Sequence, residues 1–294
     1  MNQKTAKGYL FAVLSAVIYG CMPLMSKYIY ADGVNPVTLV FLRNVFSLLP
    51  LGLLTYRQEK TLKIPAKLLP TIGILATLGC VVTPILLFSS YQFIPSGTAT
   101  VIHFAYPALV MIGGILFFKQ KANGVNILCV VMCVAGIGLF YSPDQALDPV
   151  GAALSLSSAV TFAIYVLLLS HFDNRSVTGF MLCFYTTLVS SIVSFLICLC
   201  TNGLSLPGTA MGWGLCVLFS LLVTTGAVAL FQLSTFLIGG ERVSILSTLE
   251  PITSVVIGVL IFREPMGIRT LIGTVLVIAA SIFLVIFGKK TEKA

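Results

Sequence analysis

Charged residues are scarce in this sequence: only 9% of its 294 residues are Asp, Glu, Lys or Arg, whereas 58% are hydrophobic. A soluble domain carries roughly 25% charged residues. The deficit extends along the whole chain, and the longest polar interval covers only residues 57–67. This pattern excludes a sizeable soluble domain. It indicates a polytopic membrane protein whose function lies among its helices.

Ionisable side chains suited to catalysis are also scarce. There are two His and nine acidic residues, and Glu250 alone among the acids lies deep in an apolar run, so paired carboxylates or a histidine-rich zinc site are not available. The eight Cys fall within apolar runs and behave as small hydrophobes. No Walker motif is present. We therefore expect no enzyme activity, cofactor or metal site.

Apolar runs bounded by charges or by Gly and Pro predict ten transmembrane helices. They cover residues 8–29, 36–55, 69–91, 96–118, 124–141, 150–171, 177–200, 211–237, 243–262 and 268–288. Each run is close to the roughly 20 residues that a helix needs to cross the hydrocarbon. The connections between them are short, so the bilayer is the environment of most of the chain.

The distribution of cations predicts the orientation of these helices. The net charge of +8 is a topology signal here and does not indicate nucleic acid. With the N-terminus in the cytoplasm, Lys27, Arg263 and Arg269 fall toward the outside and Arg43 lies within a span, while every other Lys and Arg falls on the inner side. This bias predicts a multi-pass protein of the cytoplasmic membrane with both termini in the cytoplasm.

The sequence contains an internal repeat at an offset of about 144 residues. Residues 86–119 align with residues 230–263, and the alignment pairs Pro107 with Pro251. The matched prolines are harder to attribute to shared apolar composition than matched Leu or Phe. The chain therefore consists of two related halves.

Each half holds five predicted helices, so the second half must enter the membrane with the opposite orientation. We expect residues 1–145 and residues 146–294 to form two inverted five-helix repeats in an all-α integral membrane protein. Inverted repeats are typical of secondary transporters, in which substrate binds near the membrane midplane at the repeat interface.

Three stretches resemble the drug/metabolite transporter superfamily, and in particular its two-repeat, ten-helix EamA-type branch. The first is "YGCMPLMSK" (residues 19–27), followed by Arg43 after "NPVTLVFL". The second is "SGTATVIHFAYPALVMIGGILFFKQK" (residues 96–121), and the third is "SILSTLEPITSVVIGVLIFREP" (residues 244–265). The resemblance covers nearly the whole chain.

Two carboxylates of this sequence stand at positions that the family pattern specifies. Glu250 stands at the position of the family's Leu-Glu-Pro in the ninth helix, and Glu264 stands at the position of the Glu after that helix. The first repeat departs from the pattern, because Gln120 occupies the position that matches Glu264. The family is known for exporting amino acids, other metabolites and drugs, and relatives carry nucleotide sugars and phosphorylated sugars, so the resemblance implies transport without naming a substrate.

Polar residues follow one face of the fourth and ninth predicted helices, at matching positions of the two repeats. A polar stripe that faced lipid would be costly, so we expect it to face the interior. Polar or aromatic residues of the first, second, sixth and eighth helices complete the predicted cavity. The candidate lining residues are Tyr19, Arg43, Thr100, His103, Tyr106, Tyr165, Gln232, Ser247 and Glu250.

Pro107 and Pro251 each remove a backbone donor from these helices and free the carbonyl one turn earlier. We predict a kink at each proline. The kink could be purely structural, satisfied by neighbouring Ser and Thr residues, or it could act as a hinge that shapes the cavity and flexes during transport.

Several ionisable residues have two readings. Glu250 could pair with a cation or cap the kink, or it could bind a substrate cation or a proton. Arg43 could link to carbonyls or extend to the outer interface, or it could contact substrate, and Lys27 is predicted to extend to the interface. His103 could be a hydrogen-bonded structural residue or a proton carrier.

The leading hypothesis is a secondary transporter that exports a small metabolite such as an amino acid by alternating access, driven by protons, another ion or the substrate gradient. The alternative is an exporter of cationic drugs through Glu250, against which Arg43 and Lys27 weigh. From other classes, a channel would not need two mirrored states, and an embedded enzyme would need clustered ionisable residues. We expect a monomer, with a dimer left open.

Overall fold

The computed structural model describes residues 3–119, 124–140, 147–170, 178–201, 203–238, 243, 246–264 and 266–287. Within these ranges the chain is helical and contains no strand.

The first half contains eight α-helices in this part of the chain. They are α1 (Gln3–Gly20), α2 (Met22–Ala31), α3 (Pro36–Glu59), α4 (Leu69–Leu75), α5 (Thr83–Ser90), α6 (Ser96–His103), α7 (Tyr106–Phe118) and α8 (Gly124–Gly138). A short 3₁₀ turn (Ala66–Leu68) precedes α4, and a π-helical segment (Ala76–Val82) joins α4 to α5. We call the latter the first π segment.

The second half contains a similar series of helices. Its described helices are α9 (Pro149–Ser170), α10 (Gly179–Cys200), α11 (Ala210–Phe219), α12 (Val228–Ile238), α14 (Leu249–Leu260) and α15 (Ile268–Phe287). The second π segment (Ser220–Ala227) joins α11 to α12.

Seven helical stretches among the described residues are long and apolar enough to cross a membrane. They are Lys4–Ala31, Pro36–Glu59, Ala66–Ser90, Ser96–Phe118, Pro149–Leu169, Gly179–Cys200 and Ala210–Phe231. The other three predicted spans correspond to shorter apolar helices in α8, α14 and α15. The 12 residues of α14 extend only about 18 Å, less than the roughly 30 Å of hydrocarbon.

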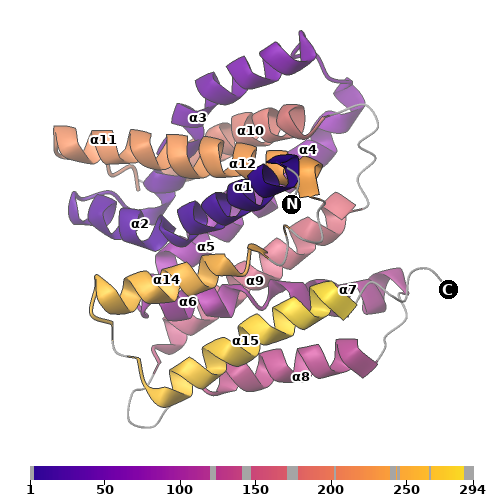
Figure 1. The fold of residues 1–294 in the computed structure, drawn as a ribbon. Helices are drawn as coiled ribbons and strands as arrows, with labels where there is room; N and C mark the ends of the chain where they lie inside the picture. Colours follow the sequence, from indigo (N-terminus) through magenta and orange to yellow (C-terminus); the bar gives the residue numbers. More distant parts are fainter. Residues whose placement is uncertain are drawn as a thin grey trace.

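The helices pack in pairs that join distant parts of the chain. At one side of the molecule α3 lies against α10, and at the opposite side α8 lies against α15 (Figure 1). Between these two pairs, α1 packs on α12 and α14, α5 packs on α9, and α6 packs on α14. The start of α14 therefore lies in the interior of the bundle.

Local sequence determines where several helices begin. Asn35 precedes α3, and its side-chain oxygen accepts a hydrogen bond from the backbone N–H of Thr38 at 2.8 Å. Pro36 follows in the first helical position, where its missing N–H has no consequence. Thr209 caps α11 in the same way through the N–H of Gly212 at 3.0 Å. These caps place the helix starts where the sequence predicts them.

The fourth and ninth predicted spans contain turns where the sequence predicts kinks. Residues 104–105 separate α6 from α7, and residues 247–248 form a turn directly before α14. Pro107 and Pro251 thereby fall in the first turn of the following helix, a position that requires no backbone donor. As a result, Tyr106 and Glu250 both stand at helix N-termini. The hinge role of the prolines stays a prediction.

The two π segments were not predicted from sequence. They begin at Ala76 and Ser220, the same offset as the sequence repeat. At the end of the first segment, the N–H and the hydroxyl of Thr83 both donate to the carbonyl of Leu78, five residues earlier, the hydroxyl at 2.8 Å. Such segments occur frequently at functional sites, since they interrupt the regular hydrogen-bond ladder.

Candidate functional site

Glu250 lies in the first turn of α14, where the positive end of the helix dipole favours a carboxylate. The helix α1 approaches it closely, because a Cβ atom at Gly20 would lie 2.7 Å from the Glu250 carbonyl oxygen. The Glu250 side chain is partly exposed and has no hydrogen bond or ion pair with another described residue. It is therefore free to accept an external partner.

Three tyrosine hydroxyls lie within electrostatic range of this carboxylate. Glu250 is close enough for its charge to act on the hydroxyls of Tyr19, Tyr91 and Tyr106. The hydroxyl of Tyr19 is also within electrostatic range of Arg43. The structure thus brings together four of the predicted site residues, Tyr19, Arg43, Tyr106 and Glu250, from α1, α3, α7 and α14.

An aromatic row extends from this group along α9. The ring of Phe162 lies 4.7 Å from that of Tyr106, at an interplanar angle of 90°, and 5.5 Å from the stacked ring of Tyr165. Tyr165 in turn packs directly on Gly79 of the first π segment. Sequence reasoning missed Phe162, although its spacing of three residues from Tyr165 indicates a shared helix face.

His103 and Thr100 are engaged in helix packing. The Nδ1 atom of His103 lies 2.8 Å from the hydroxyl of Ser158 on α9, and the side chain is only 7% exposed. The Thr100 hydroxyl donates to the Ser96 carbonyl at 2.9 Å and accepts from the Ser254 hydroxyl at 3.0 Å. These contacts join α6 to α9 and α14, which favours a structural role for His103 and engages Thr100, predicted to line the cavity, in helix packing.

The remaining candidates lie near the turn before α14 or on α12. The Ser247 hydroxyl donates to the Val243 carbonyl at 3.0 Å and so supports that turn. Gln232 belongs to α12, and its side chain lies outside the described part of the chain.

Arg43 is held inside the bundle by one hydrogen bond, from its Nη2 atom to the carbonyl of Cys80 at 3.2 Å. Its guanidinium carbon lies 5.5 Å from the centre of the Phe88 ring. Its buried Nε atom has no acceptor among the described residues. The predicted link to a carbonyl is therefore present, but it uses only a small part of the donor capacity of the guanidinium.

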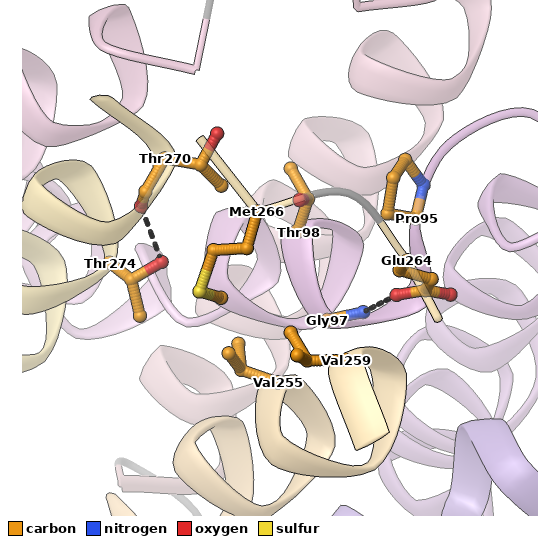
Figure 2. A pocket seen from close by; sticks show the side chains of 9 residues that line it. All are labelled: Pro95, Gly97, Thr98, Val255, Val259, Glu264, Met266, Thr270 and Thr274. Atoms are coloured by element: carbon orange, nitrogen blue, oxygen red, sulfur yellow. Dashed lines mark hydrogen bonds between the residues drawn. The ribbon is translucent and has the colours of Figure 1, made fainter. Parts of the chain in front are cut away.

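A second polar group lies beyond the other end of α14. Glu264 accepts hydrogen bonds through Oε1 from Lys27 Nζ at 2.5 Å and from the Ser96 N–H and hydroxyl at 3.0 and 2.9 Å. Its Oε2 accepts from the Gly97 N–H at 3.4 Å (Figure 2). Lys27, predicted to extend to the interface, instead forms an ion pair with Glu264. We call Lys27, Ser96, Gly97 and Glu264 the Glu264 cluster.

The Glu264 carboxylate is stabilised as an anion. Burial by itself would raise its pKa, but the hydrogen bonds from Lys27 and Ser96 outweigh burial and hold the pKa of the Glu264 carboxyl below its usual value. The ionised carboxylate thereby holds α2, the start of α6 and the segment after α14 together.

A small pocket adjoins this cluster (Figure 2). Its free volume of about 10 Å³ accommodates no more than about one water molecule. It is lined by Pro95, Gly97, Thr98, Val255, Val259, Glu264, Met266, Thr270 and Thr274. The pocket is too small for a metabolite.

A larger pocket of about 330 Å³ lies between α6, α8 and the start of α9. Its lining is apolar and consists of Ile102, Ile137, Leu147, Pro149, Ala152, Ala153 and Leu156. A polar metabolite would find no charged side chain there. The group around Glu250 and Tyr19, which lines neither pocket, offers the charged and hydroxyl groups that a polar solute needs.

Comparison with known proteins agrees with a membrane transporter. The model of the EamA-like transporter family matches residues 6–142 and again residues 149–286. The chain is also similar to a crystal structure with a TM-score of 0.65 and 14% identity, covering 98% of this chain and 99% of the other, which supports the fold alone.

Curated relatives have the same general description. The "Uncharacterized inner membrane transporter YicL" of Salmonella typhimurium is 23% identical, with 99% of each chain covered. The "Uncharacterized inner membrane transporter YhbE" of Escherichia coli K12 is 25% identical, covering 48% of this chain and 45% of the relative. An "Uncharacterized transporter" of Clostridium kluyveri is 21% identical over 55% of each. The chain thus spans about half the length of the latter two.

The family model, matched twice, covers nearly all of the chain. Together with the apolar helices, it identifies a multi-pass membrane protein. This protein belongs to the EamA-like transporter family.

Proposed function

We propose that this protein is a secondary active transporter that exports small metabolites, such as amino acids, across the cytoplasmic membrane. In this proposal the chain has ten spans, with α8, α14 and α15 belonging to the three shorter ones. Residues 1–145 and residues 146–294 form two inverted five-helix repeats that alternate between inward-open and outward-open states. A monomer suffices, because the repeat interface is internal to the chain.

The observation that carries the proposal is that helices at matching positions of the two halves make matching contacts. At the offset of the sequence repeat, α3 corresponds to α10 and α8 corresponds to α15, and each of these helices packs on its own counterpart. The contact of α1 with α12 corresponds to that of α9 with α5, and the contact of α1 with α14 corresponds to that of α9 with α7. Such pairs are what a pseudo-two-fold axis generates.

Matching close contacts support the same relation. A Cβ atom at Gly8 would collide with Ile238, and a Cβ atom at Gly151 would collide with Ile94. Gly8 and Gly151 are 143 residues apart, and Ile94 and Ile238 are 144 residues apart, so both pairs follow the repeat to within one residue. Each glycine therefore allows the first helix of one repeat to approach the other elements at an equivalent point.

Equivalent backbone conformations support it too. Lys119 and Arg263 occupy matching positions and both adopt the left-handed conformation, with φ of 53° and 52°. The family model also matches each half separately.

The orientation of the chain fits the same proposal. The first residues of α1 and the last described residues of α15 lie toward the same end of the bundle (Figure 1). This agrees with both termini lying in the cytoplasm, as the cation distribution predicts. The Glu264 cluster then lies at the outer end.

Substrate would bind between Glu250, Tyr19 and Tyr106, near the helix breaks in the middle of the bundle. Protons or another ion could share the Glu250 carboxylate. The same residues favour a second candidate, the export of organic cations, since a partly exposed carboxylate among tyrosine rings suits a cation.

Counterflow in proteoliposomes tests the proposal. Vesicles preloaded with unlabelled amino acid should accumulate the labelled amino acid transiently and saturably, and protein-free vesicles should not. An organic-cation arm separates the two substrate classes. Non-saturable, conductive flux would indicate a channel, and the absence of counterflow in every arm would refute the transporter proposal.

A further inference from the structure

Arg43 has more hydrogen-bonding capacity than the described structure uses. A guanidinium presents five N–H donors in a rigid fork and cannot lose its charge in a protein. One donor reaches the Cys80 carbonyl at 3.2 Å, while the buried Nε has no acceptor among the described residues. The Lys27–Glu264 pair lies elsewhere, and no described carboxylate neutralises Arg43.

An unpaired cation inside a membrane protein is costly and is retained where it serves a pathway. A carbonyl dipole and a ring at 5.5 Å compensate only part of this cost. A planar anionic group compensates more, because two parallel N–H donors match two oxygens. Arg43 as a whole is only partly buried, although its Nε atom is enclosed. A bound anion would supply the acceptors that Arg43 lacks.

The surroundings of Arg43 indicate which solute would carry this anion. The hydroxyl of Tyr19 lies within electrostatic range of both Arg43 and Glu250. Gly20, the residue after Tyr19, lies against α14, because a Cβ atom there would be 2.7 Å from the Glu250 carbonyl oxygen. Tyr19 is thus close to Glu250 on α14 and within electrostatic range of Arg43 on α3. A solute bound beside Tyr19 would meet opposite charges on its two sides.

Arg43 also contacts both π segments. Its side chain binds Cys80 in the first segment, and its own carbonyl accepts a hydrogen bond at 2.6 Å from the hydroxyl of Ser220 in the second. The two segments belong to the two proposed repeats. A ligand held by Arg43 would therefore be held where the two halves meet.

We propose that Arg43 binds the anionic group of the transported solute and, with Glu250, selects solutes that carry an anion and a cation together. This inference rests on the proposed transport function and names its specificity-determining residue. A molecule with an ammonium group alone would use only Glu250, and a carboxylate alone would use only Arg43.

The test uses purified full-length protein and matched ligands. The standard amino acids are screened for thermal stabilisation, and the strongest is compared with its decarboxylated amine and its deaminated acid; for leucine these are 3-methylbutylamine and 4-methylpentanoate. The variants are Arg43→Gln and Arg43→Lys. Arg57→Gln is the matched control, because Arg57 is an exposed cation on the same helix.

Arg43→Gln should weaken amino acid binding about tenfold or more and should leave amine binding unchanged, since only the charge-assisted bonds to the carboxylate are lost. Arg43→Lys, which keeps the charge but loses the fork, should lie between, and Arg57→Gln should match the wild type. If Arg43→Gln does not fold, the amino acid to amine ratio of Arg43→Lys decides.

Equal loss of amine and amino acid binding, or no loss of either, would overturn the inference. So would a wild-type protein that binds and counterflows the amine but no amino acid, although transport itself would then stand. Absence of counterflow for every ligand would instead refute the proposed function.

Discussion

The two carboxylates associated with α14 have opposite environments. Glu264, beyond the end of the helix, accepts hydrogen bonds from Lys27, Ser96 and Gly97. Glu250, in the first turn, has no such partner among the described residues and is partly exposed. A carboxylate whose bonds are satisfied within the fold stabilises one conformation, whereas one whose bonds are open can exchange partners. We therefore propose that Glu264 stabilises one conformation of the protein and that Glu250 binds the solute.

The two repeats differ at both of these positions. The first repeat has Tyr106 where the second has Glu250, and Gln120 where the second has Glu264. Both carboxylates thus belong to the second repeat. If the Glu264 cluster closes the proposed outer end, the opposite end lacks an equivalent carboxylate, so the two states of the transporter would differ in stability.

Replacing Glu250 should have the largest effect on transport. Glu250→Gln keeps the shape of the side chain but removes ionisation, and we expect about a 10- to 100-fold loss of counterflow with normal folding. The remaining activity should depend less on pH than in the wild type. Counterflow across pH and thermal unfolding measure these effects.

Glu250→Ala is the control for a structural role. If Glu250→Gln transports normally across pH while Glu250→Ala unfolds the protein, Glu250 is a cap of the helix start and the contrast with Glu264 disappears. Normal transport by both variants would direct the search toward Arg43.

Widening the contact between α1 and α14 should have the next largest effect. In Gly20→Ala the new Cβ would lie 2.7 Å from the Glu250 carbonyl oxygen and would also overlap Thr253, so the helices must separate. We expect a loss of about 1–3 kcal/mol in the free energy of unfolding, from overpacking. Reversible unfolding in detergent measures the loss.

Gly73→Ala provides the matched comparison, because Gly73 has no atom within 4 Å of the position of a Cβ. This substitution should be neutral or should stabilise by about 0.5–1 kcal/mol, as in other helix interiors. Equal effects at Gly20 and Gly73 would show that α1 is not pressed against the Glu250 backbone.

The ion pair of the Glu264 cluster should have a smaller effect that appears in stability. Lys27→Met and Glu264→Gln should each destabilise the protein, and their double-mutant cycle should give a coupling of about 1 kcal/mol. Arg57→Gln should not couple to Glu264→Gln. A coupling near zero would mean that Lys27 extends to the interface, as the sequence predicts.

The smallest effect concerns pH. Because the folded-state pKa of Glu264 lies below its usual value, its ionisation stabilises the fold above the unfolded carboxyl pKa of about 4.3, and this contribution is lost as the pH falls through the lower folded value. The melting-temperature difference between wild type and Glu264→Gln should thus be constant near neutral pH and shrink in acid. A difference that grows in acid would contradict this assignment.

Much of the helix framework can be predicted from the sequence, because a segment that crosses lipid must be both apolar and helical. An apolar run therefore marks the position of a helix. The apolar run predicts a span that begins at residue 36, and the structure begins α3 at Pro36. The paired prolines predict interruptions at the right places. They do not distinguish a kink within one helix from a two-residue turn between two helices. Proline has no backbone N–H, and both structures tolerate its absence.

The rest depends on contacts between distant residues. Lys27 and Glu264 are 237 residues apart, and nothing local to either indicates the other. For His103 the sequence allows either a structural role or proton transfer, and only the fold shows that its Nδ1 lies 2.8 Å from a hydroxyl on α9. The convergence of Tyr19, Arg43 and Glu250 likewise depends on how α1, α3 and α14 pack.

The π segments have a mechanical consequence. A π ring encloses one residue more than an α ring, so each segment is a dislocation that stores a surplus residue in the helix. If the dislocation moves along the helix, hydrogen bonds exchange one at a time, and each residue it passes rotates by about 100° about the helix axis. Two matched π segments that shifted in this way would rotate the inward-facing side chains of each half while the helices stayed hydrogen-bonded. Access could then change from one side of the membrane to the other without unfolding a helix.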